Sequence, residues 1–452
     1  MVNDLKNKNI LVFGSGLSGL SAVKLLADIG AAPILYDSDA KKTINDIKDK
    51  LPPGLEVPIY TGALPPDEIV NSLKMVVVSP GISLETKAIK EFKARGIPLI
   101  SEIELAYINT KGRIIAITGT NGKTTTVSLI GEIMKAHFPE VFIVGNIGRP
   151  FCEIALETTD ETVIVLEVSS FQLETIKTFS PFISAILNIT PDHLDRHGNM
   201  ENYVAIKERI AENQDKDKTC ILNLDNKYTA DFRKRCPADI LGFSATKELN
   251  NGCYLKSGTI FYCEDGSAEA IFNINETKLV GSANMENIMA ALLAGIKMGI
   301  SRETIITAIR NFRAVEHRLE YVATHNGVDY YNDSKATNPD AAIQGVRAMT
   351  KPTVLLAGGS DKKTDYTLWL LECKGKIKAL ILFGETRDEI AACAINVGFT
   401  NIYKTATMNE ALTIGKKIVT PGDAILLSPA CASFDMFKNY EERGRVFKEL
   451  VL

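Results

Sequence analysis

Apolar residues near the start of the chain fall into short runs separated by segments of helical spacing. The runs at 10–13, 33–36 and 75–78 predict buried strands, and the spacing over 17–29 predicts an amphipathic helix. Strands that alternate with helices are typical of a doubly wound, mainly parallel sheet. Residues 1–101 therefore predict a Rossmann-like α/β domain.

The alternation continues through residues 102–314. Apolar runs at 114–117, 163–166 and 185–188 predict further strands. Short β-like runs between 253 and 279 are broken by Gly and Asn, and they predict an antiparallel addition to a mainly parallel sheet.

The last portion of the chain repeats the α/β pattern. Runs at 353–357, 379–383 and 424–427 predict buried strands, and a charged terminal helix is expected from Asn439. Clefts between such domains are the expected place for a site that takes several substrates. The sequence predicts three α/β domains, at 1–101, 102–314 and 315–452.

The clearest chemical motif follows the apolar run at 114–117. Residues 117–126 read ITGTNGKTTT, so a strand, a glycine-bearing turn and a helix start come in succession. Such a turn can present backbone N–H groups to phosphates, with Lys123 reaching the β- and γ-phosphates and the Thr124 hydroxyl ligating Mg²⁺. Gly119 and Gly122 stand closer together than in the usual Walker loop, so an ordinary tight turn with a chance lysine is the alternative. The order of the elements favours a site for a nucleoside triphosphate.

A second glycine motif, GSGLSG at residues 14–19, follows the first predicted strand, and Asp37 ends the second. By itself this pattern is typical of dinucleotide binding, and a tight turn beneath a helix is the alternative. The helix start favours a ligand with a pyrophosphate. NAD and a nucleotide sugar both fit, and the motif does not choose between them.

Composition narrows the class of protein. The formal net charge of −4 gives no reason to expect nucleic-acid binding. Eight cysteines without a Cys-x-x-Cys pair argue against zinc and a disulfide framework, and favour a reducing cytoplasm. The N-terminus lacks a signal-peptide core, and no segment approaches membrane-spanning length. We expect a soluble cytoplasmic protein that binds neither nucleic acid nor membrane.

Polar residues follow two strands of the middle portion. Glu167 ends the run at 163–166, where a carboxylate near the phosphate loop can hold Mg²⁺; a helix-capping acid is the alternative. His193 and His197 share a post-strand loop with two acids. His193 is the favoured ligand, and His197 is the weaker case.

Three further residues of the middle portion are ambiguous by sequence. Composition alone makes Lys207 a solvated helix lysine. Asn284 and Asn287 lie three apart on one helix face, where they can cap, be solvated or read a base.

The last portion carries polar loops after its strands. His317 and Arg318 begin this portion, and the loop at 332–338 is rich in polar residues before a helix that starts at about Pro339. Such loops can clamp phosphates and developing charge, although each can also be a plain turn. Several of them in one domain predict a substrate-binding face.

Together these motifs resemble the Mur ligase family, the ATP-dependent amide-forming enzymes of peptidoglycan synthesis. The short glycine spacing of the phosphate loop is this family's own variant. The resemblance spans all three portions and rests on residues 118–124, 167–170, 188–193, 284–287, 317–318 and 333–335. A resemblance to the branch that adds D-glutamate rests on residues 171–174, 332–338, 428–434 and 437–439. The Asp-Asn-Pro-Arg signature of the diaminopimelate-adding branch is not found.

The resemblance implies an ATP-dependent acid–D-amino-acid ligase that adds D-glutamate to UDP-N-acetylmuramoyl-L-alanine through an acyl phosphate. The implied catalytic residues are Lys123, His193, Lys207, Arg318 and Lys335. The implied ATP contacts are Gly119, Thr120, Asn121, Gly122, Lys123, Thr124, Thr125, Asn284, Asn287, Arg318 and Asp333. The implied ligands of two Mg²⁺ ions are Thr124, Glu167, His193 and Lys207, the last as a carbamate.

The resemblance also assigns the other two substrates. The implied contacts of the UDP substrate are Gly16, Leu17, Ser18, Asp37, Ser38, Asn146, Ser169 and Gln172. The implied contacts of D-glutamate are Thr337, Lys362, Ser433, Phe434 and Tyr440. Asp39 stands where a basic residue is expected. A monomer is expected.

Three alternatives stay open at this point. One is a ligase of the same family that adds a different amino acid. Another is an NAD-dependent oxidoreductase built on residues 14–37, and the third is a non-catalytic nucleotide-sensing protein.

Overall fold

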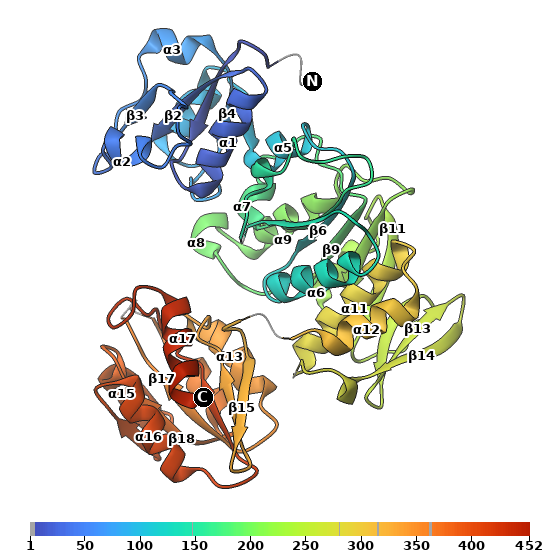
Figure 1. Ribbon diagram of the computed structural model, residues 1–452, viewed down its shortest axis with the longest axis vertical. Helices are drawn as coiled ribbons and strands as arrows, with labels where there is room; N and C mark the ends of the chain where they lie inside the picture. Colours follow the sequence, from blue (N-terminus) through green and yellow to red (C-terminus); the bar gives the residue numbers. More distant parts are fainter. Residues whose placement is uncertain (1–4, 147, 280, 314–315, 361–363) are drawn as a thin grey trace. The chain divides into compact units, whose positions relative to one another are not determined.

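The computed structural model describes residues 5–146, 148–279, 281–313, 316–360 and 364–452 (Figure 1). The chain divides into two compact units, residues 1–272 with 286–309 and residues 273–285 with 310–452. The described residues form three mainly parallel sheets flanked by helices, so the predicted α/β class is confirmed. The expected boundary between 314 and 315 lies outside the described residues, and the bounds of the three domains stay a prediction.

The first sheet has five parallel strands in the order β3-β2-β1-β4-β5. This order matches the first five strands of the doubly wound Rossmann order 3-2-1-4-5-6, with its switch point between β1 and β4, where the glycine motif follows β1. The strands are β1 (Asn9–Phe13), β2 (Ala32–Asp37), β3 (Ile59–Thr61), β4 (Leu73–Val78) and β5 (Leu99–Ser101). The helices are α1 (Leu17–Asp28), α2 (Ile44–Lys48), α3 (Asp67–Ser72), α4 (Lys87–Ala94) and α5 (Glu102–Tyr107).

The second sheet has nine strands in the order β14-β13-β12-β11-β10-β9-β6-β8-β7. The pairs from β7 to β12 are parallel, and β13 joins β12 antiparallel, which confirms the predicted antiparallel addition. The strands are β6 (Arg113–Thr118), β7 (Val141–Gly145), β8 (Val163–Glu167), β9 (Ile183–Ile186), β10 (Thr219–Asn223), β11 (Asp239–Ser244), β12 (Gly252–Lys256), β13 (Thr259–Glu264) and β14 (Ser267–Asn273). The helices are α6 (Lys123–Lys135), α7 (Ser170–Leu173), α8 (Leu194–His197), α9 (Met200–Glu208), α10 (Lys227–Phe232), α11 (Ser282–Lys297) and α12 (Arg302–Asn311).

One strand of this sheet ends earlier than the sequence predicts. The apolar run at 185–188 predicts a strand through Asn188, but β9 ends at Ile186. The Asn188 side chain instead pairs with the backbone of Asn121, accepting from its N–H at 2.8 Å and donating to its carbonyl at 3.1 Å. This side chain therefore ties the end of β9 to the phosphate loop.

The third sheet has six strands in the order β15-β16-β20-β17-β18-β19, antiparallel only at β15–β16 among its described pairs. Apolar clusters cover both of its faces, one around Trp369 and the other around Phe447. The strands are β15 (Glu320–His325), β16 (Val328–Asn332), β17 (Thr353–Ala357), β18 (Ile377–Leu382), β19 (Ile402–Lys404) and β20 (Ala424–Leu427). The helices are α13 (Pro339–Ala348), α14 (Thr367–Cys373), α15 (Arg387–Asn396), α16 (Met408–Ile418) and α17 (Tyr440–Val451).

Among the described residues, no helix has both the length and the apolar character needed to cross a membrane.

A buried carboxylate joins α5 to the loop before β9. Glu104 accepts hydrogen bonds from the backbone N–H groups of Lys177, Thr178 and Phe179 at 2.8–3.0 Å, and from the Thr178 hydroxyl at 2.6 Å. The side chain lies in the interior. Three consecutive N–H donors thus converge on one acceptor group.

We expect Glu104→Gln to lower the free energy of unfolding by about 2–3 kcal/mol, because an amide NH₂ would face backbone donors that lose their acceptor. Urea unfolding of both proteins measures the difference. Glu132→Gln is the control, since Glu132 forms an exposed pair with Lys135 on α6 and should change stability by less than about 1 kcal/mol. Equal effects of the two substitutions would contradict the expectation.

Candidate active site

The predicted phosphate loop is a strand–turn–helix between β6 and α6. Gly122 adopts the left-handed conformation (φ 86°) at the N-cap of α6, and among the described residues no side chain caps that helix end. The Lys123 ammonium folds back over the loop and donates to the carbonyl oxygens of Gly119 (2.8 Å) and Thr120 (2.9 Å). A helix start with a glycine cap and an adjacent ammonium fits a phosphate chain.

Neighbouring residues hold the loop in place. The Thr120 hydroxyl donates to the carbonyl oxygen of Thr190 at 3.1 Å and lies 3.2 Å from the Tyr203 hydroxyl. Asn287 lies next to Gly122, because a Cβ atom added to that glycine would stand 2.4 Å from the Asn287 Oδ1 atom. The predicted ATP residues of the first compact unit thus meet around the start of α6.

Lys207 corrects the composition-based prediction of a solvated helix lysine. Only 1% of its surface is exposed, since α9 turns Tyr203, Val204 and Lys207 inward. Its ammonium donates to the Gly119 carbonyl at 2.9 Å and lies 4.9 Å from the centre of the Tyr203 ring. Burial, and then the charge of Lys123, hold the pKa of Lys207 well below its ordinary value.

Glu167 is placed beside the phosphate loop by strand register. It pairs with Ile117 of β6 on one side and with Gly145 of β7 on the other. Its carboxylate is buried and accepts from the Asn146 amide at 3.2 Å. Together with the buried Thr124 hydroxyl it offers the oxygen ligands that Mg²⁺ prefers.

The two histidines of the loop after β9 differ in their surroundings. His193 has positive φ (51°) and an exposed ring 4.9 Å from the ring of Phe171. His197 is buried, with Nε2 3.0 Å from the Ser170 hydroxyl. His193 therefore remains the residue of the pair that a ligand can reach. In the part of the chain that the structure describes, no group of three or more His, Cys, Asp or Glu side chains is arranged as a metal site.

Asp37 anchors the glycine turn after β1. Its Oδ2 atom accepts from the Ser15 N–H (3.0 Å), the Ser15 hydroxyl (2.5 Å) and the Lys42 ammonium (2.7 Å), while Oδ1 accepts from the Asp39 N–H. Burial opposes ionisation, but the hydrogen bonds from Lys42 and Ser15 outweigh it and lower the pKa of Asp37 to about 2. Gly16 and Leu17 are exposed at the start of α1, Ser18 is half-buried, and Ser38, which follows β2, is exposed.

Ser169 and Gln172 form a capping box at the start of α7. The Gln172 carbonyl oxygen accepts from the Ser169 N–H (2.8 Å) and hydroxyl (3.0 Å), and its NH₂ group donates to Glu102 at 2.7 Å. Burial raises the pKa of Glu102 to about 7, and its second oxygen has no hydrogen-bond partner among the described residues. Sequence reasoning missed Glu102, which contacts Gln172 and through it supports Ser169.

The polar loops of the second unit converge at the ends of β16 and β20. Asp333 is buried and accepts from the Ser428 hydroxyl (2.7 Å) and from the Leu319 N–H (3.2 Å). Burial raises its pKa to about 7. The Lys335 ammonium lies 5.7 Å from the centre of the Tyr440 ring. Three predicted site residues, Asp333, Lys335 and Tyr440, thus lie in one region of this unit.

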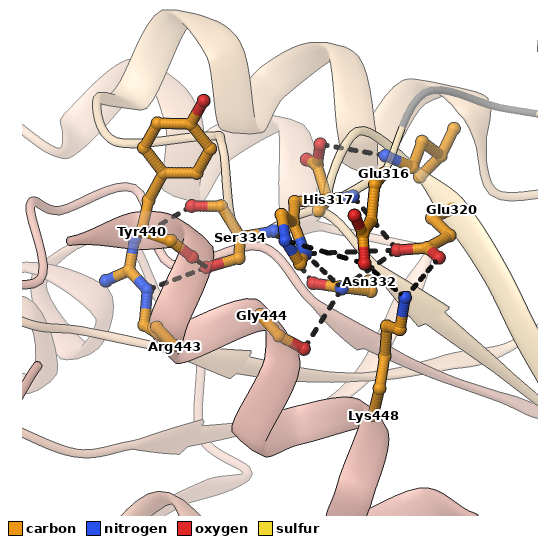
Figure 2. A network of polar contacts seen from close by, with 11 residues as sticks. Glu316, His317, Glu320, Asn332, Ser334, Tyr440, Arg443, Gly444 and Lys448 are labelled. Atoms are coloured by element: carbon orange, nitrogen blue, oxygen red, sulfur yellow. Dashed lines mark hydrogen bonds and ion pairs between the residues drawn. The ribbon is translucent and has the colours of Figure 1, made fainter.

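Figure 2 shows the network behind this site. The Asn332 amide lies 3.0 Å from His317 Nδ1, 3.1 Å from Glu320 and 3.2 Å from the carbonyl oxygen of Gly444. The Lys448 ammonium joins Glu320 from α17 at 2.9 Å (Figure 2). These contacts fix His317, which has positive φ (65°), directly before Arg318.

Arg443 is a second residue that sequence reasoning missed. Its fully buried guanidinium donates to the Ser334 hydroxyl and carbonyl and to the carbonyls of Cys431 and Ala432, all at 2.9–3.1 Å. It therefore joins the loop after β16 to the loop after β20. A usable signal was its spacing in α17, where it shares the buried face with Phe447 and Val451.

The residues predicted to receive D-glutamate differ in how deeply they are buried. Ser433 is buried, Phe434 is 72% exposed, and Thr337 and Tyr440 are half-buried. Lys362 lies outside the described residues.

The fold and site define a nucleotide-binding α/β protein in which a phosphate loop stands next to a buried lysine and a buried carboxylate. Family models match three stretches: the MurD-like N-terminal domain of Mur ligases at 8–101, the Mur ligase middle domain at 117–295 and the Mur ligase glutamate ligase domain at 317–431. The chain belongs to the Mur ligase family.

Relatives span nearly the whole chain. A protein of Lachnospira eligens named UDP-N-acetylmuramoylalanine–D-glutamate ligase is 46% identical over 448 residues, which cover 99% of each chain. One of Caldicellulosiruptor bescii with the same name is 42% identical, covering 99% of this chain and 98% of its own. The Thermotoga maritima MurF ligase, solved in complex with ADP, shares the fold with a TM-score of 0.59 at 14% identity, covering 100% of this chain and 96% of its own.

We expect Gly122→Ala to weaken ATP binding at least about tenfold, because the added Cβ meets Asn287 in a backbone conformation that alanine disfavours. Calorimetric titration with ATP and Mg²⁺ measures the change. Gly96→Ala is the matched control, since Gly96 has a similar φ (70°) and no described heavy atom beyond its chain neighbours lies within 4 Å of an added Cβ. Unchanged ATP affinity in Gly122→Ala would exclude the proposed phosphate loop.

Proposed function

We propose that the protein is an ATP-dependent ligase that joins D-glutamate to UDP-N-acetylmuramoyl-L-alanine in peptidoglycan precursor synthesis. The observation that carries the proposal is similarity over 99% of the chain to relatives whose names state this reaction. The phosphate loop supplies the matching chemistry, because it offers a site for the phosphates of ATP. We place the reaction in the cytoplasm, in a monomer with domains at 1–101, 102–314 and 315–452.

The reaction needs activation because a carboxylate has a poor leaving group. The γ-phosphoryl group of ATP is transferred to an oxygen of the L-alanine carboxylate, which gives an acyl phosphate and ADP. The amine of D-glutamate then attacks the carbonyl carbon, and the tetrahedral intermediate expels phosphate. An amide forms, and the amine proton is lost to the surroundings.

Positive groups offset the charge that develops during this transfer. We assign Lys123 to the β- and γ-phosphates, and Arg318 and Lys335 to the charge that develops on the transferred group. Asn284, Asn287 and Asp333 complete the nucleotide contacts, with the backbone of Gly119–Thr125 around the phosphates. The burial of Asn287 and Asp333 supports roles as fixed, oriented groups.

Mg²⁺ would be held by Thr124, Glu167, His193 and carbamylated Lys207, and it would neutralise phosphate charge. Lys207 suits carbamylation because burial and the nearby charge of Lys123 lower its pKa, which favours the neutral amine that reacts with CO₂. The neutral amine nitrogen bonds to the carbon of CO₂ and releases a proton to the surroundings, so a group that can carry a positive charge becomes an anionic carbamate. That exchange also removes the repulsion between Lys207 and Lys123.

The remaining residues receive the other two substrates. Gly16, Leu17, Ser18, Asp37 and Ser38 take the UDP end at the start of α1, and Asn146, Ser169 and Gln172 contact the rest of that substrate. Thr337, Lys362, Ser433, Phe434 and Tyr440 receive D-glutamate.

An NAD-dependent oxidoreductase is a weaker proposal. The glycine turn at 14–19 would suit a dinucleotide, but the phosphate loop and buried Lys207 would then have no role.

Phosphate release from ATP should depend on both UDP-N-acetylmuramoyl-L-alanine and D-glutamate, and mass spectrometry should find the amide product. A panel of amino acids measures the specificity, with L-glutamate as the stereochemical control. Equal turnover with another amino acid would leave the family intact and refute the D-glutamate assignment. ATP binding without stimulated turnover would favour a nucleotide sensor.

We expect Lys207→Ala to lower kcat about a hundredfold, because the group that orients the metal is lost, and short-chain carboxylates should restore part of the rate. Steady-state assays with and without acetate or propionate measure both effects. Lys216→Ala is the control, since Lys216 donates to the Ala238 carbonyl at 3.0 Å elsewhere in the same unit and should need no rescue. Full activity of Lys207→Ala without added carboxylate would rule out the carbamate.

A further inference from the structure

Arg196 in α8 has no part in the chemistry described so far, yet it is one of the best-connected side chains of the first unit. Its Nε and Nη2 atoms donate to the two oxygens of Glu174 at 3.2 and 2.6 Å. Only 13% of the Arg196 side chain and 8% of the Glu174 side chain are exposed. This forked, mostly buried pair fixes the guanidinium plane.

The same guanidinium reaches the loop that follows β4. Nη1 donates to the carbonyl oxygen of Pro80 at 3.3 Å, and Nη2 donates to that of Ile82 at 2.7 Å. This loop lies directly on the glycine turn: a Cβ added to Gly14 would stand 2.9 Å from the Ser79 Cβ and 3.3 Å from Ile82. Arg196 therefore contacts the loop that packs against the glycine turn.

On its other side, Arg196 lies against the loop that carries His193. The guanidinium carbon is 4.5 Å from the centre of the Phe171 ring, and that ring is 4.9 Å from the imidazole of His193. α8 begins at Leu194, immediately after His193. One side chain thus spans from the support of the glycine turn to the neighbourhood of His193.

Packing alone does not fix this junction. A cavity of about 270 Å³ opens beside it, lined by Ser83, Leu84, Glu174, Arg196, His197 and Ile206, among others. Where side chains leave such a space, interdigitation constrains the two segments less than it does in a filled core. The directional bonds of Arg196 then carry more of the constraint.

We propose that Arg196 is a positioning residue that sets the spacing between the glycine turn and the reaction centre near His193. The proposal rests on the proposed function, in which one substrate is held by its UDP end at the glycine turn and by its carboxylate end near His193. Two-point binding of one ligand gains affinity only when the spacing of the two points matches the ligand. A residue that fixes this spacing affects the whole substrate and leaves its UDP fragment unaffected.

The test compares the dissociation constants of UDP and of UDP-N-acetylmuramoyl-L-alanine by calorimetry, in the wild-type protein and in two variants. Arg196→Lys keeps a cation next to Glu174 but loses the fork, and Arg196→Gln loses both. We expect affinity for the full substrate to fall about tenfold in Arg196→Lys and further in Arg196→Gln, while UDP affinity changes less than about twofold.

Arg209→Lys is the matched control. The Arg209 guanidinium also donates to backbone carbonyls, those of Leu173, Glu174 and Ile176, and it pairs with Glu212. All of these contacts lie within the middle portion of the chain, so this variant should leave the ratio of the two dissociation constants unchanged.

Each other outcome has a distinct meaning. Equal weakening of UDP and of the full substrate would show that Arg196 only supports the glycine turn, and would overturn the spacing role. Unchanged affinities in both Arg196 variants, or an equal change of the ratio in Arg209→Lys, would overturn it as well. Failure of the wild-type protein to bind the full substrate at all would refute the proposed function itself.

Discussion

Two amines hold one carbonyl oxygen, and the candidate site is arranged around that contact. Lys207 donates to the Gly119 oxygen from inside the protein, and Lys123 donates to it from the loop itself. The two charges repel each other at the bottom of the site, which makes the ionised form of the buried amine costly. An anionic ligand that draws Lys123 away relieves this repulsion, while Lys207 keeps the loop in shape.

Hydrophobic periodicity was enough to predict the three sheets, because most of their strands are apolar on both faces. The phosphate loop could also be located from the sequence, because its glycines and lysine lie in one continuous segment. Periodicity could not show the burial of Lys207, since one lysine in a short helix does not reveal which face turns inward. It placed the end of β9 too late, because the pairing of Asn188 with Asn121 joins segments far apart in the sequence.

Residues that act through others were missed from the sequence, although the helical spacing of Arg443 with Phe447 and Val451 indicated that its side chain is buried. Glu102 and Arg443 each work by contacts with backbone or amide groups, whose positions exist only in the folded chain. Asp37 shows the converse: its place at the end of β2 was predicted, but its hydrogen bonds are mainly with Ser15 and Lys42. Its prominence in the motif thus reflects support of the glycine turn at least as much as contact with a ligand.

The position of Arg443 also has a consequence for how the chain acquires its structure during synthesis. The loops after β16 and β20 are both translated before α17. Their carbonyl groups accept hydrogen bonds from the Arg443 guanidinium, which belongs to α17. A ribosome-bound chain that ends before α17 therefore holds both loops without the group that joins them. The two loops can therefore reach their final arrangement around the guanidinium only after α17 has been made.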